Sequence, residues 1–155
     1  MIRRTFWTML LLSFVNSLLA ADPWIGVWKM NVAKSTFPPG REVKEMTVTV
    51  AEQGEDAAIT GRVVTAAGTV TSSKYTIPFK GGTAKFTEGG PPPGSILAGV
   101  RVDVKTLRFT LTMNGRQVQQ DQTVLSTDGK SFTQTTAGVD QSGKTYKTVQ
   151  VFERQ

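Results

Sequence analysis

The chain has 155 residues, a formal net charge of +6, and neither Cys nor His. The lack of Cys excludes disulfides and thiol chemistry, and the lack of His removes the commonest general base and metal ligand. The length fits one domain, and the low content of charged residues, 19%, favours a folded domain over disorder.

The first twenty residues have the pattern of a secretory signal peptide. Arg3 and Arg4 supply the positive start, residues 6–19 an apolar stretch, and Ala20/Ala21 the cleavage region. The apolar stretch is interrupted by polar residues and is shorter than the roughly 20 residues of a spanning helix. We therefore predict a signal peptide over residues 1–20 and a periplasmic or secreted domain over residues 21–155, with no integral membrane span after cleavage.

The exported part opens with two tryptophans around a glycine. Gly26 allows another backbone or a ring to approach closely, and Trp28 is large enough to fill the base of a small barrel. We expect a structural role for both residues. Trp24 receives no role from the sequence.

Turn signals divide the rest of the chain into short segments. Asn-Gly at 114–115 and Asp-Gly at 128–129 are the strongest signals, because both tolerate the positive φ angles of two-residue hairpins. Apolar residues alternate with polar ones over 46–50, over 75–79 and, most clearly, over 107–113. No segment after the signal has helical spacing over more than about a turn. The pattern predicts an antiparallel meander of about eight to ten strands.

A meander of this length is expected to close into a barrel, because closure removes the exposed sheet edges. A two-layer sandwich is the alternative that periodicity does not exclude. Pro78 cannot donate to a central ladder and is expected at a strand end or bend. Residues 89–94, Gly-Gly-Pro-Pro-Pro-Gly, are expected to form a stiff connection.

Residues at both ends of the chain resemble those of a known superfamily. Gly26-Val27-Trp28 matches the Gly-x-Trp element on the first strand of lipocalins and their calycin relatives. Residues 24–30 and 151–154 resemble the two ends of fatty-acid-binding proteins, and residues 28–40 resemble the start of small exported bacterial lipocalin-like proteins. The resemblance implies an up-and-down barrel plugged by Trp28, with Arg154 covering the indole in a cation–π contact.

Two features depart from the fatty-acid-binding pattern. Residues 33–41, which contain Pro38-Pro39-Gly40, are too few and too broken for a two-helix lid. Gln150 and Phe152 stand where those proteins commonly carry the Arg and Tyr that hold a ligand carboxylate. Fatty-acid binding is therefore not implied.

Alternation in the last three predicted strands suggests a lumen with amides among aromatics. An apolar wall with a few polar groups suits a neutral or weakly polar small molecule. A slip of one residue would place the same side chains on the wet face instead. The predicted ligand-facing residues, in phase with Val118 and Val124, are Gln120, Gln122, Phe132, Gln134, Tyr146, Gln150 and Phe152.

Nothing in the sequence indicates catalysis. It carries no nucleophile motif or phosphate loop, and the carboxylates at 52–56 lack the spacing of a Ca²⁺ loop. Lys34, Arg41 and Lys44 form a basic group near the predicted mouth, which serves either solubility or attraction of an anionic ligand or headgroup. The charge without Arg3 and Arg4 is +4, and no motif of Arg with aromatics accompanies it, so we expect no nucleic-acid partner.

The sequence as a whole predicts an exported, monomeric, non-enzymatic barrel that binds a small hydrophobic or amphipathic molecule without a cofactor. The alternative is an envelope interaction protein whose barrel is packed solid and whose loops or rims make the contacts. An open lumen would favour the first hypothesis, and aromatics filling the barrel would favour the second.

Overall fold

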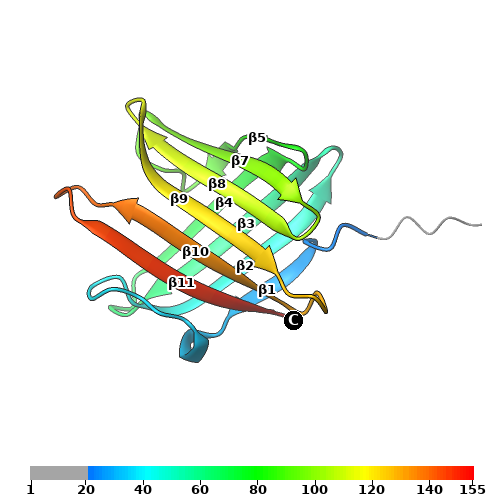
Figure 1. The fold of residues 1–155 in the computed structure, drawn as a ribbon, viewed down its shortest axis with the longest axis horizontal. Coiled ribbons are helices and arrows are strands. Elements are labelled where there is room, and N and C mark those ends of the chain that lie inside the picture. The colour runs from blue at the N-terminus through cyan, green and yellow to red at the C-terminus, as the bar shows by residue number, and fades with distance from the viewer. Residues whose placement is uncertain (1–20) are drawn as a thin grey trace, which may run out of the picture.

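The computed structural model describes residues 21–155, so the predicted signal peptide over residues 1–20 lies outside the described residues. The described chain forms one antiparallel sheet that curls into a nearly closed barrel (Figure 1). Its one helical element is a short 3₁₀ turn, η1. The elements are β1 (Gly26–Met30), η1 (Val32–Lys34), β2 (Val43–Gln53), β3 (Asp56–Thr65), β4 (Val70–Pro78), β5 (Gly81–Thr83), β6 (Lys85–Glu88), β7 (Ser95–Asp103), β8 (Thr106–Met113), β9 (Arg116–Leu125), β10 (Ser131–Val139) and β11 (Thr145–Arg154).

The all-β barrel predicted from the sequence is confirmed, although the described chain has eleven strands rather than the eight to ten expected, because β5 and β6 are short strands of three and four residues. Asn114 and Gly115 make the turn between β8 and β9 with φ angles of 50° and 78°, which is why Asn-Gly serves there. Pro78 is the last residue of β4, as expected for a residue that cannot donate to the ladder. The alternation over 107–113 forms β8.

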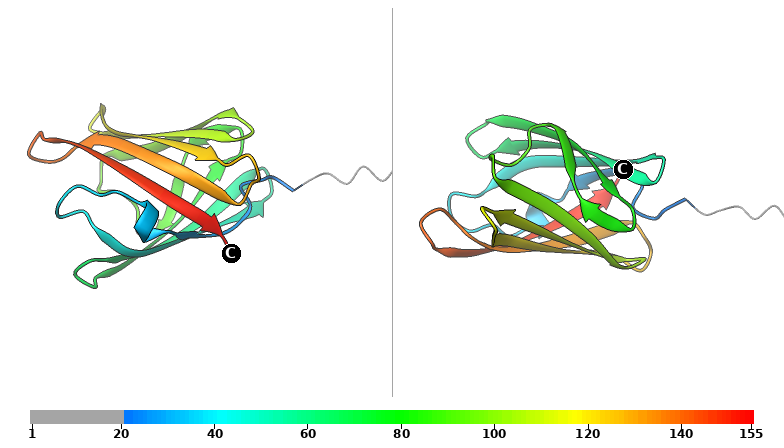
Figure 2. Two further views of the ribbon diagram at one scale, coloured as in Figure 1. Left: turned by 60° about the horizontal axis from the view of Figure 1, so that its bottom comes forward. Right: turned by 90° about the horizontal axis from the view of Figure 1, so that it is seen from above.

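The two ends of the described chain meet in the middle of the sheet. β1 lies between β11 and β2, and Trp28 is paired with Arg154 on one side and Val48 on the other. From β7 to β11 and from β1 to β4, neighbouring strands follow one another in the chain, which is the meander that the turn spacing predicts (Figure 2).

The barrel closes at a seam formed by residues 81–88. The first half of this segment, β5, pairs with β7, and the second half, β6, pairs with β4. One short segment therefore joins the two edges of the sheet in turn, with three paired residues on each side. Of the other strand pairs in residues 21–155, only β1 and β11 share so few paired residues, also three.

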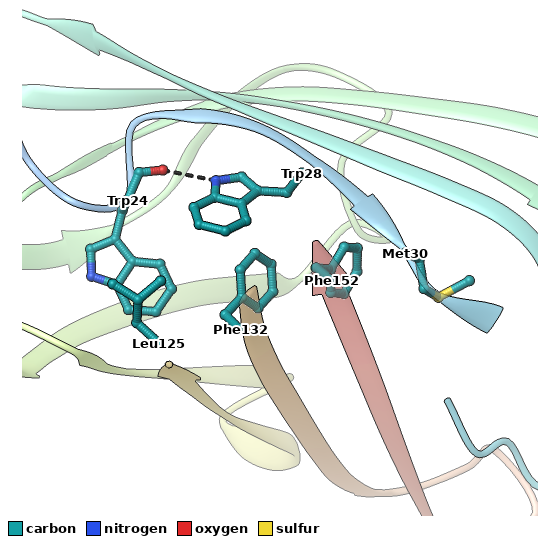
Figure 3. Close-up of a cluster of buried hydrophobic side chains, with 6 residues drawn as sticks. All are labelled: Trp24, Trp28, Met30, Leu125, Phe132 and Phe152. Atoms are coloured by element: carbon teal, nitrogen blue, oxygen red, sulfur yellow. Dashed lines mark hydrogen bonds between the residues drawn. The ribbon is translucent and has the colours of Figure 1, made fainter. Parts of the chain in front are cut away.

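One end of the barrel is filled with aromatic side chains, which we call the plug. Trp28 and Phe152 are fully buried, and the Phe132 ring lies between them, 5.0 Å from the Trp28 ring and 4.6 Å from the Phe152 ring (Figure 3). Offset and edge contacts of this kind add to the stabilisation from apolar burial. The full set of buried plug residues is Trp24, Trp28, Met30, Leu125, Phe132 and Phe152.

Polar contacts fix the plug in place. The Arg154 guanidinium carbon lies 4.1 Å from the centre of the Trp28 ring, and the same guanidinium donates to the carbonyls of Pro23, Ile25 and Gly129. Gly26 has a φ of 145°, and a Cβ there would lie 2.5 Å from Arg154 Nη1. Glycine at this position leaves room for the guanidinium rather than for a ring.

Candidate functional site

A cavity of about 210 Å³ lies in the barrel above the plug. Trp24 and Phe132 belong both to the plug and to the cavity lining, so the plug is the cavity floor. Small residues keep the space open: a Cβ at Gly61 would come 2.9 Å from Ser73 Oγ, and one at Gly99 would come 2.7 Å from Ile77 Cδ1. The apolar wall includes Val48, Val50, Ile59, Ile77, Leu107 and Phe109.

A carboxylate faces this apolar wall. Asp121 on β9 lines the cavity and is 6% exposed. Gln119 Nε2 donates to both of its carboxylate oxygens at 3.1 Å. Burial raises the pKa of Asp121 above its ordinary value, and hydrogen bonds from Thr136, Gln119 and Gln134 offset only part of that effect.

Tyr75 on β4 faces the same cavity from the opposite side of the barrel. Its ring lies 4.8 Å from that of Phe86, which holds it against the seam. Burial raises the pKa of the Tyr75 hydroxyl to about 12, and the charge of Asp121 contributes in the same direction. The phenol is therefore neutral at physiological pH and is a donor or acceptor of hydrogen bonds.

No salt bridge within residues 21–155 includes Asp121. Arg101 on β7, the one basic residue among the described residues that line the cavity, is paired with Asp22 at 2.6 Å, and both side chains are mostly buried. Arg101 and Asp22 neutralise each other at the plug end of the barrel, so Arg101 is not a partner of Asp121. The carboxylate of Asp121 is left with neutral hydrogen-bond donors only.

A second, more open hollow of about 550 Å³ lies toward the other end of the barrel. Gln119 and Tyr146 are part of its wall, and Tyr146 Oη donates to Gln119 Oε1 at 2.8 Å. The guanidinium carbon of Arg41, at the rim, lies 3.7 Å from the centre of the Tyr146 ring. Contacts therefore run from Arg41 through Tyr146 and Gln119 to Asp121, joining the outer hollow to the inner cavity.

The predicted ligand-facing residues divide between these places. Phe132 and Gln134 line the inner cavity, and Tyr146 lines the outer hollow. Gln150 points inward but packs its amide against the sulfurs of Met30 and Met46, at 3.8 and 3.9 Å. Phe152 is buried in the plug and lines neither hollow.

The expectation that Gln120 and Gln122 face the lumen is wrong. Both are exposed, whereas Asp121 and Thr123 are buried. The cause is a register shift: Leu111 pairs with Gln119 and Thr112 with Gln117, so Val118 is an extra residue on β9. A bulge of this kind reverses the faces of the residues beyond it. Val118 does line the outer hollow, but Val124, assigned to the same phase, is 42% exposed.

Sequence reasoning missed the residues that most define the cavity. Asp121 lies in a run of Gln and Val residues with nothing to mark it, and its inward orientation depends on the bulge at Val118. Trp24, which received no role from the sequence, donates from its indole Nε1 to the Val104 carbonyl, and its backbone carbonyl accepts from Trp28 Nε1 at 3.0 Å. Its ring closes the bottom of the cavity.

The basic residues predicted near the mouth have separate contacts. Lys34 Nζ pairs with Glu153 Oε1 at 2.9 Å, alongside β11, and Arg41 lies over Tyr146. Hydrogen bonds from Lys34 and Asn31 lower the pKa of Glu153. These contacts use Lys34 and Arg41 to fix the segment between β1 and β2.

No group of three or more acidic residues that could hold a metal ion occurs in residues 21–155. No helix in the same residues is long and apolar enough to cross a membrane.

No protein-family model and no curated protein matches the sequence. Among solved structures, the chain is similar to Rv2717c from M. tuberculosis, with a TM-score of 0.54, 15% identity, and coverage of 86% of this chain and 94% of that one. It also matches zebrafish ileal bile acid-binding protein complexed with cholic acid, with a TM-score of 0.49, 17% identity, and coverage of 86% and 99%. The chain has a calycin-like, lipocalin-like fold.

Proposed function

We propose that this protein is an exported, non-enzymatic binding protein that holds a small hydrophobic or amphipathic molecule in the barrel. The observation that carries the proposal is the cavity above the plug, whose wall is apolar and whose polar groups are few and converge near Asp121. This combination is typical of small-molecule sites. A barrel packed solid, as the interaction hypothesis requires, would lack this space.

The size of the cavity limits the ligand. About 210 Å³ is below the ~300–1,000 Å³ of most ligand pockets. The ligand is therefore small, or its remainder extends toward the outer hollow. The zebrafish bile acid-binding protein carries cholic acid in its crystal structure, but the cavity here is proposed to take a smaller molecule.

Export is part of the proposal and rests on the sequence of residues 1–20. Arg3 and Arg4 followed by the apolar stretch support a cleaved signal. N-terminal sequencing of the protein recovered from its own cell envelope tests this separately from binding. Cleavage near Ala20/Ala21 is expected, and an intact N-terminus would contradict it.

Binding is tested by titration with N-phenyl-1-naphthylamine, an apolar dye whose fluorescence rises in dry sites. We expect saturable binding with one site per chain. Val50→Trp places a large ring in the cavity and is expected to abolish binding while the protein stays folded. Thr49→Trp adds the same ring one residue away on the other face of β2 and is expected to bind as the unmodified protein does.

Equal dye binding by both variants would show that the dye binds outside the barrel cavity. No saturable binding of any apolar probe by the unmodified, folded protein would contradict the proposed function.

A further inference from the structure

The carboxylate of Asp121 is buried at the cavity wall without a charged partner among the described residues. It lines the cavity, is 6% exposed, and takes part in no salt bridge within residues 21–155. Gln119 Nε2 donates to both of its oxygens at 3.1 Å, and Gln134 and Thr136 on β10 are further hydrogen-bond partners. All of these partners are neutral, so none of them balances the charge of an ionised carboxylate.

The other groups around the cavity do not supply the missing positive charge. Arg101 is held by Asp22 at 2.6 Å, and Tyr75 across the cavity is a neutral phenol. Gln134 and Thr136 on β10 contribute neutral hydrogen-bonding groups. The inner cavity therefore carries one uncompensated acidic group in apolar surroundings.

We propose that the ligand is a small apolar amine whose protonated nitrogen pairs with the Asp121 carboxylate, while its hydrocarbon part lies against the wall formed by Val50, Ile59 and Phe109. This inference rests on the proposed binding function and names its ligand class. A buried charge is costly unless a partner charge and hydrogen bonds compensate it. An ammonium group supplies both at once.

The same geometry disfavours ligands with a carboxylate head. A ligand carboxylate and the Asp121 carboxylate are like charges, which repel each other in a site of low polarity. Arg101, the one basic residue of the described cavity lining, is already paired with Asp22 and does not offset this repulsion. The positions where an Arg and a Tyr would hold such a head are Gln150 and Phe152, and Gln150 is turned to Met30 and Met46. The cavity therefore favours a positively charged headgroup over a carboxylate.

The test compares three eight-carbon probes that differ only in the headgroup: octylamine, octan-1-ol and octanoate. Calorimetric titration at pH 7 is expected to give the tightest binding for octylamine, with octanoate weaker than octylamine by about tenfold or more. Octan-1-ol is expected to lie between them, since it donates a hydrogen bond without a charge.

Asp121→Asn removes the charge and keeps the shape. The variant is expected to bind octylamine about tenfold more weakly than the unmodified protein does. Its affinity for octan-1-ol should stay within about twofold, and the difference in affinity between octylamine and octanoate should become smaller. Glu52→Gln removes one negative charge from an exposed position at the end of β2 and serves as the matched control. It is expected to change none of the three affinities.

The two proposals fail in different ways. If octan-1-ol binds in the cavity but octylamine has no advantage over octanoate in the unmodified protein, the amine inference is overturned and the binding function stands. If none of the three probes binds to the folded protein, both are overturned. If Glu52→Gln weakens octylamine as much as Asp121→Asn does, the effect is one of overall charge, which also overturns the inference.

Discussion

The two ends of the barrel use the same curved sheet in different ways. At the plug, Trp28 and Phe152 are fully buried, and the polar atoms that must be buried with them have partners. Above it, Gly61 and Gly99 stand in place of larger side chains, and Asp121 has no salt-bridge partner within residues 21–155. The difference teaches that side-chain volume, not backbone geometry, decides where the barrel is solid and where it is hollow. We expect stability to depend mostly on the plug and binding on the hollow half.

The largest expected effect comes from emptying the plug. Trp28→Ala removes a fully buried indole and its contact with Arg154, and should lower the free energy of unfolding by about 3–5 kcal/mol. Val27→Ala, at the neighbouring outward position that is 40% exposed, should change it by less than about 0.5 kcal/mol. Urea denaturation measures both. Similar losses for the two variants would mean that the plug is not the stabilising region.

A smaller loss is expected when the cover of the plug is removed. Arg154→Met keeps much of the apolar stem but leaves the carbonyls of Pro23, Ile25 and Gly129 without their donor. We expect a loss of about 2–3 kcal/mol in the free energy of unfolding. Arg154→Lys should recover only part of it, because an ammonium cannot reproduce the planar fork of a guanidinium. If Arg154→Lys recovered the full free energy of unfolding, the positive charge alone, and not the guanidinium geometry, would account for the stabilisation.

In the hollow half, Asp121 should make stability depend on pH in a characteristic direction. Its pKa in the folded protein lies above the ordinary 3.8, so the folded state favours the protonated form. The contribution of this carboxyl to stability is therefore greatest below about pH 3.8 and is lost as the pH rises through the raised pKa.

Asp121→Asn removes this loss. We expect the variant to gain stability relative to the unmodified protein as the pH rises from acid to neutral, by about 1 kcal/mol in the absence of ligand. Denaturation series of both proteins at several pH values measure the difference, in which the effects of the exposed acidic groups cancel. A difference that stays constant with pH would show that Asp121 has the same pKa in both states.

The smallest effects should separate two glutamines on neighbouring strands. Within the described chain the side-chain amide of Gln150 has only the sulfurs of Met30 and Met46 as hydrogen-bond partners, so Gln150→Leu should change the free energy of unfolding by less than about 1 kcal/mol. Gln134 lines the cavity and is a hydrogen-bond partner of Asp121, so Gln134→Leu should cost about 1–2 kcal/mol and alter probe binding. Equal effects would mean that the cavity does not distinguish the two positions.

The sequence was sufficient for the fold because the fold depends on signals that repeat. Turn dipeptides such as Asn114-Gly115 and the alternation in β8 recur along the chain, and one misread segment does not change the architecture. Arg154 lies over Trp28 as the resemblance implies. Such long-range pairs were accessible only through that resemblance, since spacing alone places no two distant residues together.

The candidate site was less predictable because it depends on single residues. The bulge at Val118 reverses the faces of β9, and nothing in a run of Val and Gln indicates where the extra residue lies. On β10 and β11, which have no register shift between them, the faces of Phe132, Gln134 and Gln150 follow the alternation. The inward Asp121 and the outward Val124 also oppose the usual pattern of apolar residues inside and polar residues outside, so alternation alone gives the wrong phase for this strand.

The seam has a consequence for how the protein behaves at high concentration. β6 pairs with β4 only from Lys74 to Thr76, which leaves the backbone around Ser72 at an open edge. The chain leaving β6 covers that edge, and Gly89 passes so close to Ser72 that a Cβ there would collide with its carbonyl oxygen. The three prolines that follow offer no N–H groups to a ladder. We therefore expect this edge of the seam to resist strand addition by a second molecule, and with it edge-to-edge aggregation.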